Sequence, residues 1–277
     1  ADLGLEAGTP VSYRAGDQPN NAFSLNVLDP GEVAATGGTS GVVYGVTDVP
    51  RPDRFSRVNT FLHVNHEPRR PRYGVLLCIN GTGILNAWVK KTTVPDMSYP
   101  EVNRRCAEIP VGSEGVLMLP FGNGAERMLG NRYTGAEAIG LDLNRHDRFH
   151  LLRAAQEGIA FAFRYGMDVM RETGLRLRVI RAGYANLFLS PVFRQTLATL
   201  CGADIELYNT DGALGAARGA ALGAGLYASR EETFASLRKI DEVRPDPADR
   251  DVLERGYARW KAELENRLGR ASHGTSV

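Results

Sequence analysis

An aspartate at a helix start and a glycine-rich loop farther along the chain are the residues best suited to chemistry. Ala15-Gly16-Asp17 places a carboxylate just before a helical pattern, and Gly37-Gly38-Thr39-Ser40-Gly41 follows a short strand pattern. Glycines around a threonine and a serine can aim backbone N–H groups and hydroxyls at phosphate oxygens. The loop lacks the lysine of a Walker A motif, so it is not a P-loop. Together, the carboxylate and the loop indicate phosphoryl transfer.

Asp17 has two interpretations that are compatible. It precedes the apolar residues Phe23, Leu25 and Val27 of a helical pattern, with Pro19 near the first turn, which is typical of an N-cap. Taken alone, this pattern favours the cap. An aspartate is also ionised at neutral pH and is a sufficient base for a hydroxyl held within hydrogen-bond reach. Phosphoryl transfer depends mainly on such positioning and on neutralising phosphate charge.

Two later glycine-containing segments could matter, one for a phosphate site and the other for close packing. Gly183-Tyr184-Ala185-Asn186 stands between a strand pattern and a helix pattern, so backbone amides at a helix start could face a nucleotide. Gly212 and Gly215 lie in a helical segment of small residues, which allows close packing against a sheet. The Gly183 turn is therefore a second candidate contact for a nucleotide, whereas the small-residue segment by itself predicts close packing only.

Alternating and helical patterns predict the elements that position these residues. The turn Pro30-Gly31-Glu32 leads into a strand that delivers the glycine loop, and a second strand completes a hairpin around it. Strands are predicted at 11–14, 33–36, 42–46, 58–64, 73–78, 116–122, 176–182, 203–207 and 239–244. Helices are predicted from Asp17 to Leu28 and at 84–89, 99–108, 148–173, 191–201, 210–227 and 246–268.

Several residues in these elements are predicted to have structural roles only. Gly158 and Gly166 lie within the longest helical pattern, and we expect them to mark close contacts with other helices. Gly174 is expected to end that helix as a C-terminal cap. Glu126 and Arg127 are expected to form an ion pair or to anchor their loop, and not to act in catalysis.

The composition is that of an ordinary soluble globular protein of 277 residues, 43% hydrophobic, with a net charge of +1. A near-neutral charge gives no footprint for nucleic acid or membrane surfaces. The cysteines are three in number and widely separated, which indicates no disulfide and a reducing, cytoplasmic location. His63, His66 and Glu67 share a loop with prolines and arginines, so no metal site is predicted there.

The motifs fall in the order of a known family. Ala-Gly-Asp, a helix, Pro30-Gly31-Glu32, a strand and Gly-Thr-Ser-Gly resemble the core of the FGGY carbohydrate kinases, and the run 38–44 is closest to xylulose kinases. The resemblance continues through Leu119-Pro120-Phe121 and the Gly183 turn, and covers almost the whole chain. It implies an α/β fold of the actin-like ATPase (ribonuclease H-like) kind, with a mixed sheet flanked by helices. It also implies a core position for Trp88.

The resemblance implies an ATP- and Mg²⁺-dependent carbohydrate kinase, most like an enzyme that converts D-xylulose to D-xylulose 5-phosphate. Asp17 would take the hydroxyl proton as general base, and Gly16 and Asp17 would contact the sugar. Sugar kinases usually carry Gly-Gly-Gly-Ala where this chain has Arg181-Ala182-Gly183-Tyr184, a departure at the adenosine contacts. The implied nucleotide-binding residues are Gly38, Thr39, Ser40, Gly41, Gly183, Asn186, Gly212 and Gly215.

The family's first half carries an Asp-x-Gly-Thr segment that handles phosphate and metal, and this chain, which opens on Ala1, has none. We therefore expect residues 1–270 to be the C-terminal nucleotide-binding lobe of a sugar kinase and residues 271–277 to be a mobile tail. Such a fragment is expected to be inactive alone, with Mg²⁺ held mainly by the other half. The expected partners are a small-molecule sugar and ATP, not nucleic acid or a membrane. Because the family often forms dimers, a homodimer is also an option.

Two alternatives stay open on the sequence alone. An actin-like or chaperone-type ATPase lobe shares the fold and the hairpin but couples ATP to conformation. Stimulation of ATP hydrolysis by a sugar or by a peptide would separate that alternative from a kinase. A sugar-kinase relative that only binds or regulates is the second alternative, and the unusual turn Arg181-Ala182-Gly183 is its main support.

Overall fold

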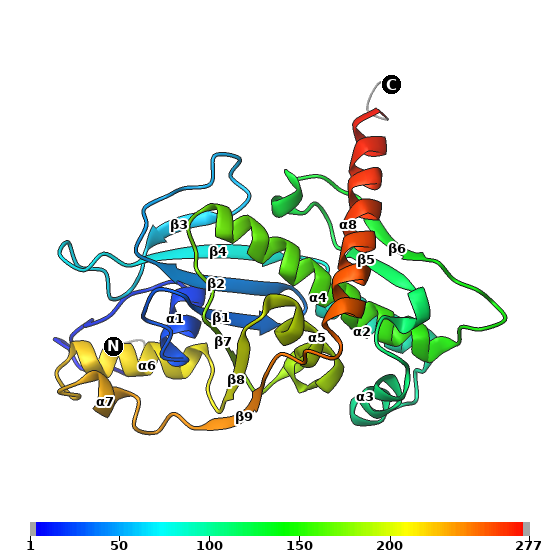
Figure 1. The fold of residues 1–277 in the computed structure, drawn as a ribbon. Helices are drawn as coiled ribbons and strands as arrows, with labels where there is room; N and C mark the ends of the chain where they lie inside the picture. Colours follow the sequence, from blue (N-terminus) through cyan, green and yellow to red (C-terminus); the bar gives the residue numbers. More distant parts are fainter. Residues whose placement is uncertain (1–3, 274–277) are drawn as a thin grey trace.

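A mixed sheet of seven strands, in the order β3-β4-β2-β1-β7-β8-β9, forms the centre of the folded protein. Strands β5 and β6 pair with each other in a separate sheet. The computed structural model describes residues 4–273 (Figure 1). The strands are β1 (Glu32–Gly37), β2 (Gly41–Thr47), β3 (Asn59–Leu62), β4 (Tyr73–Ile79), β5 (Leu117–Phe121), β6 (Gly135–Ile139), β7 (Val179–Gly183), β8 (Asp204–Tyr208) and β9 (Lys239–Val243). Strand β7 runs parallel to both β1 and β8, and the other pairings are antiparallel.

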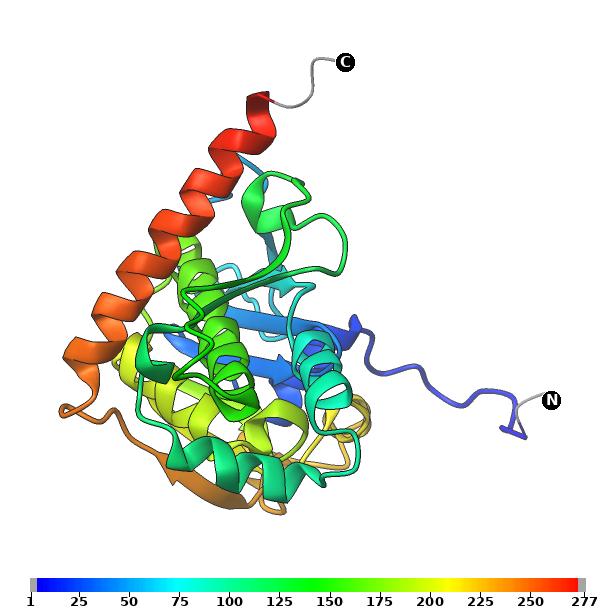
Figure 2. The ribbon, with the colours of Figure 1, turned by 90° about the vertical axis from the view of Figure 1, so that its right-hand side faces the viewer.

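Helices cover both faces of the large sheet. They are α1 (Asp17–Ser24), α2 (Gly83–Thr93), α3 (Tyr99–Glu108), α4 (Arg148–Glu172), α5 (Pro191–Cys201), α6 (Gly212–Gly223), α7 (Arg230–Thr233) and α8 (Arg250–His273). Short 3₁₀ turns lie at Ser113–Gly115, Arg127–Leu129 and, as η3, at Asn186–Leu189. Helices α1 and α6 lie side by side on one face, whereas α4 and α5 lie on the other with α8 along their outside (Figures 1 and 2). The predicted α/β fold with a mixed, helix-flanked sheet is confirmed.

The predicted hairpin around the glycine loop is confirmed as β1 and β2, which pair from Val33 and Gly45 down to Gly37 and Gly41. Residues alternate between the two faces of β1 because its side-chain period is two. Val33 and Ala35 belong to the core on the α4 side, whereas Ala34 packs with the residues of α1. Because helices cover both faces, β1 is apolar and buried almost throughout.

Helix α4 is the central helix of the larger core. Asp147 caps its N-terminus by accepting the N–H groups of Phe149 and His150, and Gly174 follows its C-terminus with a left-handed φ of +95°. The prediction that Gly158 and Gly166 contact other helices is wrong. A Cβ on Gly158 would lie 2.1 Å from the Met118 carbonyl of β5, and one on Gly166 would meet Leu77 of β4 at 2.2 Å. Both glycines therefore let α4 approach strands.

Trp88 is not a core residue, contrary to the sequence-based expectation, because its side chain is 62% exposed. Apolar residues extend around more than one face of α2, and only the face with Leu85 and Val89 belongs to the core, where α2 packs against α4. Trp88 lies outside that face.

The predicted strand 11–14 is also absent, because Ser12 and Tyr13 lie along α6 and not beside a strand. The Ser12 hydroxyl donates to the Ala220 carbonyl at 2.7 Å, and the Tyr13 ring packs over Gly219. The exposed segment before them runs away from the body of the protein (Figure 2).

Other predicted elements differ only at their ends. Helix α1 stops at Ser24 because Asn26 has a left-handed φ of 54°, although Leu25 and Val27 beyond it are still buried. Helix α6 ends at Gly223, and α8 begins at Arg250 and continues to His273. The expected tail therefore shares residues 271–273 with α8, and residues 274–277 lie outside the described range.

Candidate active site

Asp17 is the first residue of α1, and its carboxylate is exposed. The cap position belongs to Gly16, whose backbone is extended, so the prediction of Asp17 as the N-cap is wrong by one residue. The carboxylate accepts the backbone N–H of Gln18 at 2.8 Å. It borders a cavity of about 490 Å³, which we name the Asp17 cavity. Its other lining residues include Arg14, Phe61, Leu76 and Gln18. The other oxygen of the Asp17 carboxylate accepts the Gln18 side-chain amide at 3.3 Å. The carboxylate thus lies beside a space that can admit a small molecule, and its oxygens can accept further hydrogen bonds.

The glycine loop is fixed by its contact with the start of α2. Gly83 donates its N–H to the Gly38 carbonyl at 3.0 Å, and Ile84 donates to the Thr39 carbonyl at 3.1 Å. A Cβ on Gly83 would lie 2.2 Å from that Gly38 oxygen, so only glycine allows this approach. The loop carbonyls satisfy amides that a helix start leaves unpaired. The turn Gly38-Thr39-Ser40 therefore has a defined conformation, with Thr39 exposed.

Gly38 and Thr39 line a cavity of about 520 Å³ together with Asn186, and we name it the hairpin cavity. Asn186 follows β7 and has a left-handed φ of 52°, which is uncommon outside glycine and is found mostly at constrained turns. Leu187 closes the gap between this turn and the hairpin, since a Cβ on Gly37 would meet it at 2.9 Å. The structure thus brings together two of the candidate phosphate and nucleotide segments.

The remaining candidate glycines lie near these segments but in packed positions. Gly41 approaches Phe163 and Thr82, either of which a Cβ would meet at 2.7 Å, and Gly183 approaches the Thr210 carbonyl. Gly212 and Gly215 face α1, and a Cβ on Gly215 would lie 2.0 Å from the Asn20 carbonyl. These two glycines therefore set the position of the helix that begins at Asp17.

Asp17 is electrostatically linked to the end of β4. The pKa of the Cys78 thiol is raised, first by its partial burial and further by the negative charges of Asp17 and Glu126, while Arg127 opposes the shift. Cys78 pairs with Val42, the residue directly after the glycine loop. Asp17 therefore lies near β4, the strand that pairs with the second strand of the hairpin.

Glu126 anchors the loop between β4 and α2, which is one of the two roles predicted for it. Its carboxylate is fully buried and accepts the N–H groups of Asn80 at 3.0 Å and Gly81 at 2.9 Å. Burial raises the pKa of Glu126, and these two N–H groups oppose that shift. Arg127 donates to the Ser56 carbonyl at 2.6 Å and also acts as an anchor. Both residues hold loops in place, and neither lines the Asp17 cavity or the hairpin cavity.

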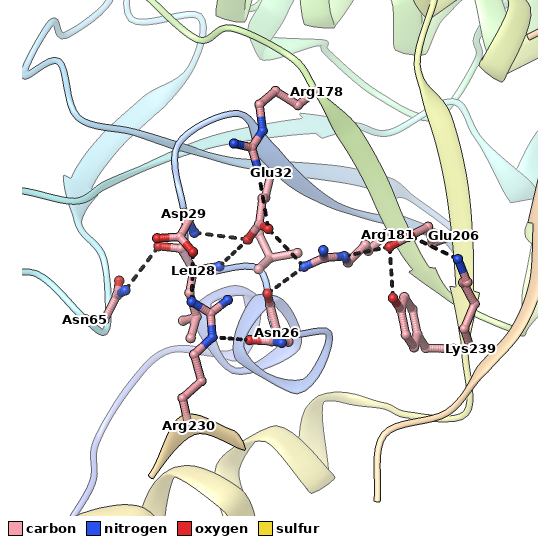
Figure 3. Close-up of polar contacts among 12 residues, drawn as sticks. Asn26, Leu28, Asp29, Glu32, Asn65, Arg178, Arg181, Glu206, Arg230 and Lys239 are labelled. Carbon is pink, nitrogen blue, oxygen red and sulfur yellow. Dashed lines mark hydrogen bonds and ion pairs between the residues drawn. The ribbon is translucent and has the colours of Figure 1, made fainter. Parts of the chain in front are cut away.

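A polar network joins β7 to the turn after α1 (Figure 3). The Arg181 guanidinium lies 3.3 Å from Glu32 and 2.9 Å from Glu206, and it donates to the Asn26 carbonyl at 2.6 Å. Glu32 is 4% exposed and also accepts two backbone N–H groups of the turn before β1. Arg181 is therefore engaged by β1, β8 and the turn after α1, and it does not line the hairpin cavity.

Sequence reasoning missed the polar wall of the hairpin cavity. Asn86 of α2, Tyr99 and Asn103 of α3, and Ser190 before α5 all line it. Behind them lies Gln156 of α4, which is fully buried. The available signal was Gln156 itself, because it interrupts the apolar face of α4.

No group of three or more His, Cys, Asp or Glu side chains within residues 4–273 is arranged to hold a metal ion. Of the loop histidines, His63 is buried against Tyr44 and Val27, and a ring nitrogen of His66 lies 3.0 Å from the Arg72 carbonyl. In the same range, none of the helices has the length and apolar character needed to cross a membrane.

Comparison with known proteins identifies the class. The FGGY family of carbohydrate kinases, C-terminal domain, matches residues 33–228, and the chain belongs to this family. The crystal structure of xylulose kinase from Rhodospirillum rubrum is similar with a TM-score of 0.85 and 26% identity, over 97% of this chain and 54% of that one. The expected relation to the actin-like ATPase fold is thereby confirmed.

Two curated relatives have similar coverage. The xylulose kinase of Haemophilus influenzae is 27% identical over 272 residues, which is 95% of this chain and 52% of the relative. The L-xylulose/3-keto-L-gulonate kinase of Escherichia coli is 29% identical over 271 residues, which is 93% of this chain and 50% of the relative. The chain therefore spans about half the length of the curated relatives it matches.

Proposed function

We propose that the chain is the C-terminal, nucleotide-binding lobe, within residues 1–270, of a kinase that transfers the γ-phosphoryl group of ATP to a sugar hydroxyl. The observation that carries this proposal is the exposed Asp17 carboxylate, which borders a cavity that is also lined by Leu76 of β4, the strand paired with β2 of the glycine hairpin. A base and a phosphate-binding turn on neighbouring elements are the two protein parts that phosphoryl transfer needs. Membership of the FGGY family supports the same reaction.

In this reaction the sugar hydroxyl oxygen attacks the γ-phosphorus, the bond to the β-phosphate oxygen breaks, and ADP leaves. Asp17 accepts the hydroxyl proton late in the transfer, with Gly16 beside the sugar. The phosphates lie at the turn Gly38-Thr39-Ser40-Gly41, and Asn186 and Gly183 contact the nucleoside. Gly212 and Gly215 contribute by bringing α6 against the helix of Asp17. Mg²⁺ would carry part of the phosphate charge, with ligands from the nucleotide and mainly from the other half of the kinase.

D-Xylulose, giving D-xylulose 5-phosphate, is the substrate that we propose. Its support is the name shared by several relatives, including the Haemophilus influenzae protein. The L-xylulose/3-keto-L-gulonate kinase relative is equally similar to the chain. The names of the relatives therefore do not by themselves identify the sugar. Because Arg181 is paired with Glu32 and Glu206, its side chain does not fill the hairpin cavity. A cavity left open for a nucleotide favours a kinase over a non-catalytic relative.

The test compares the complete natural polypeptide with its Asp17→Asn variant, by ADP release with ATP, Mg²⁺ and each of xylulose, ribulose, glycerol and gluconate. Loss of a general base lowers kcat by about 10²–10⁴-fold, while the affinity for ATP is retained. Asp48→Asn is the matched control, because Asp48 is exposed at the far end of β2 from the hairpin and should not affect turnover. The absence of turnover with every one of these sugars would contradict the proposal.

A further inference from the structure

Gln156 is a fully buried polar residue in the middle of α4, and it connects three residues that line the hairpin cavity. Its side-chain carbonyl accepts the Ser190 hydroxyl at 2.7 Å. Its amide nitrogen donates to Oδ1 of Asn103 at 3.2 Å and to Oδ1 of Asn86 at 3.5 Å. The Gln156 side chain therefore forms hydrogen bonds with one hydroxyl and two amide oxygens of the cavity wall.

These contacts determine which way the two asparagines point. Each uses its oxygen toward Gln156, so each NH₂ group is the end left for the cavity. Within the described residues, neither Asn86 Nδ2 nor Asn103 Nδ2 has a hydrogen-bond partner, although Asn86 is only 8% exposed. Neither nitrogen is among the fully buried side-chain atoms that lack a partner, so both are accessible and can donate to a ligand or water in the cavity. The cavity wall is thus built to meet hydrogen-bond acceptors.

The position of this wall indicates which part of a nucleotide it meets. The cavity is lined both by the hairpin, with Gly38 and Thr39, and by Tyr99 and Asn103 of α3. Tyr99 and Asn103 are one helical turn apart, so they share a face of α3. Tyr99 is 46% exposed and offers an aromatic surface beside the free amide. With phosphates at the hairpin, the base extends toward α3.

We propose that Asn86 and Asn103 recognise the base of the nucleotide by donating hydrogen bonds to acceptor nitrogens of a purine ring. In this arrangement Gln156 is a positioning residue, which holds both amides with their NH₂ groups toward the base. The inference rests on the nucleotide site of the proposed function and adds the residues that give it base specificity.

The variant Gln156→Glu tests the polarity of the wall, because a carboxylate has nearly the same shape but can only accept hydrogen bonds. Asn86 and Asn103 must then turn their NH₂ groups toward Glu and their oxygens toward the cavity. The three donors that surround the new carboxylate compensate for its burial. The donors that meet the base are thereby replaced by acceptors.

The measurement is calorimetric binding of ADP and of its 1-deaza, 3-deaza and 7-deaza analogues, each of which lacks one purine acceptor, to the complete natural polypeptide. We expect at least one analogue to bind the wild-type protein about tenfold more weakly than ADP, the effect of roughly 1.4 kcal/mol. In Gln156→Glu, ADP binds about tenfold more weakly and the analogue is discriminated less than twofold. Gln195→Glu makes the same chemical change outside both cavities and should retain wild-type behaviour.

Each other outcome counts against the inference. Equal binding of ADP and all three analogues by the wild type would overturn it, as would discrimination that survives in Gln156→Glu. If that variant does not fold, Asn103→Leu on the outer helix replaces it, and discrimination by Asn103→Leu equal to that of the wild type would overturn the proposal. A wild-type protein that binds no ADP would instead refute the nucleotide site of the proposed function, and this inference with it.

Discussion

At the scale of single residues, His63 is a titratable side chain that lines the Asp17 cavity and is only 3% exposed. The Tyr44 hydroxyl donates to Nδ1 of His63 at 2.9 Å, and the Nε2–H of His63 donates to the Val27 carbonyl at 3.0 Å. Both ring nitrogens are therefore used by the neutral form. Burial lowers the pKa of His63 to about 4, although the hydrogen bond to Val27 opposes this shift.

This shift gives the protein a pH-dependent stability. Between about pH 6.5 and 4, the unfolded chain has a protonated His63 and the folded chain a neutral one, so the free energy of unfolding falls as the pH is lowered through this window. The expected loss from this residue is about 2 kcal/mol between pH 7.5 and 5. Urea unfolding at both pH values should show a smaller loss in His63→Gln, which can keep both hydrogen bonds. An equal loss in the variant and the wild type would contradict this assignment.

At the scale of elements, the Arg181 network ties three segments that lead to the site (Figure 3). Strand β1 continues from Glu32 to the hairpin, β7 continues from Arg181 to the Asn186 turn, and Asn26 lies just after α1. The guanidinium of Arg181, in the middle of β7, therefore contacts the start of β1 and the turn after the helix that carries Asp17.

Removal of Arg181 leaves the buried Glu32 carboxylate without its nearer cation, and only the exposed Arg178 guanidinium remains, at 3.8 Å. We expect Arg181→Met to lower the free energy of unfolding by about 3 kcal/mol, because breaking one side of a buried pair costs more than the pair contributes. Adding Glu32→Gln should restore about half of this loss, since the uncompensated charge is then gone. The measurement is a double-mutant cycle in urea. Strictly additive losses from the two substitutions would show that the two side chains are not coupled.

The elements of this fold differ in how far their sequence determines them. The β1–β2 hairpin was predictable because a glycine turn stands between two apolar runs, which is a local signal. Residues 11–14 have a strand-like composition but no neighbouring strand to pair with. Trp88 is exposed because the apolar surface of α2 is wider than the face of that helix that is buried. Both errors arise from tertiary contacts that a local pattern does not contain.

The candidate site shows the same division. Asp17 and Gly38 were found from the sequence because a helix start and a glycine turn have recognisable composition. The cavity wall was not found, because Asn86, Asn103 and Gln156 are far apart in sequence and meet only through the packing of α2, α3 and α4. Such a wall leaves only one trace in sequence, a polar residue on the buried face of a helix.

For the whole molecule, the decisive feature is that the Asp17 cavity lies open on a chain about half the length of its relatives. A general base acts on a sugar hydroxyl only when the sugar is held within hydrogen-bond reach of it. Exclusion of water then limits the hydrolysis of ATP. An exposed Asp17 meets neither condition by itself, so we infer that a second lobe covers it during turnover.

The 277-residue chain assayed alone is therefore expected to phosphorylate xylulose at less than about a thousandth of the rate of the complete natural polypeptide, since positioning and a closed site contribute most of the acceleration. The measurement is ADP release with ATP, Mg²⁺ and xylulose, with circular dichroism on the same samples to establish that the chain is folded. Adding the complementary half as a separate chain should raise the rate if the two halves associate. A folded 277-residue chain that turns over at the rate of the complete protein would show that Asp17 and its cavity form a finished site without any covering lobe.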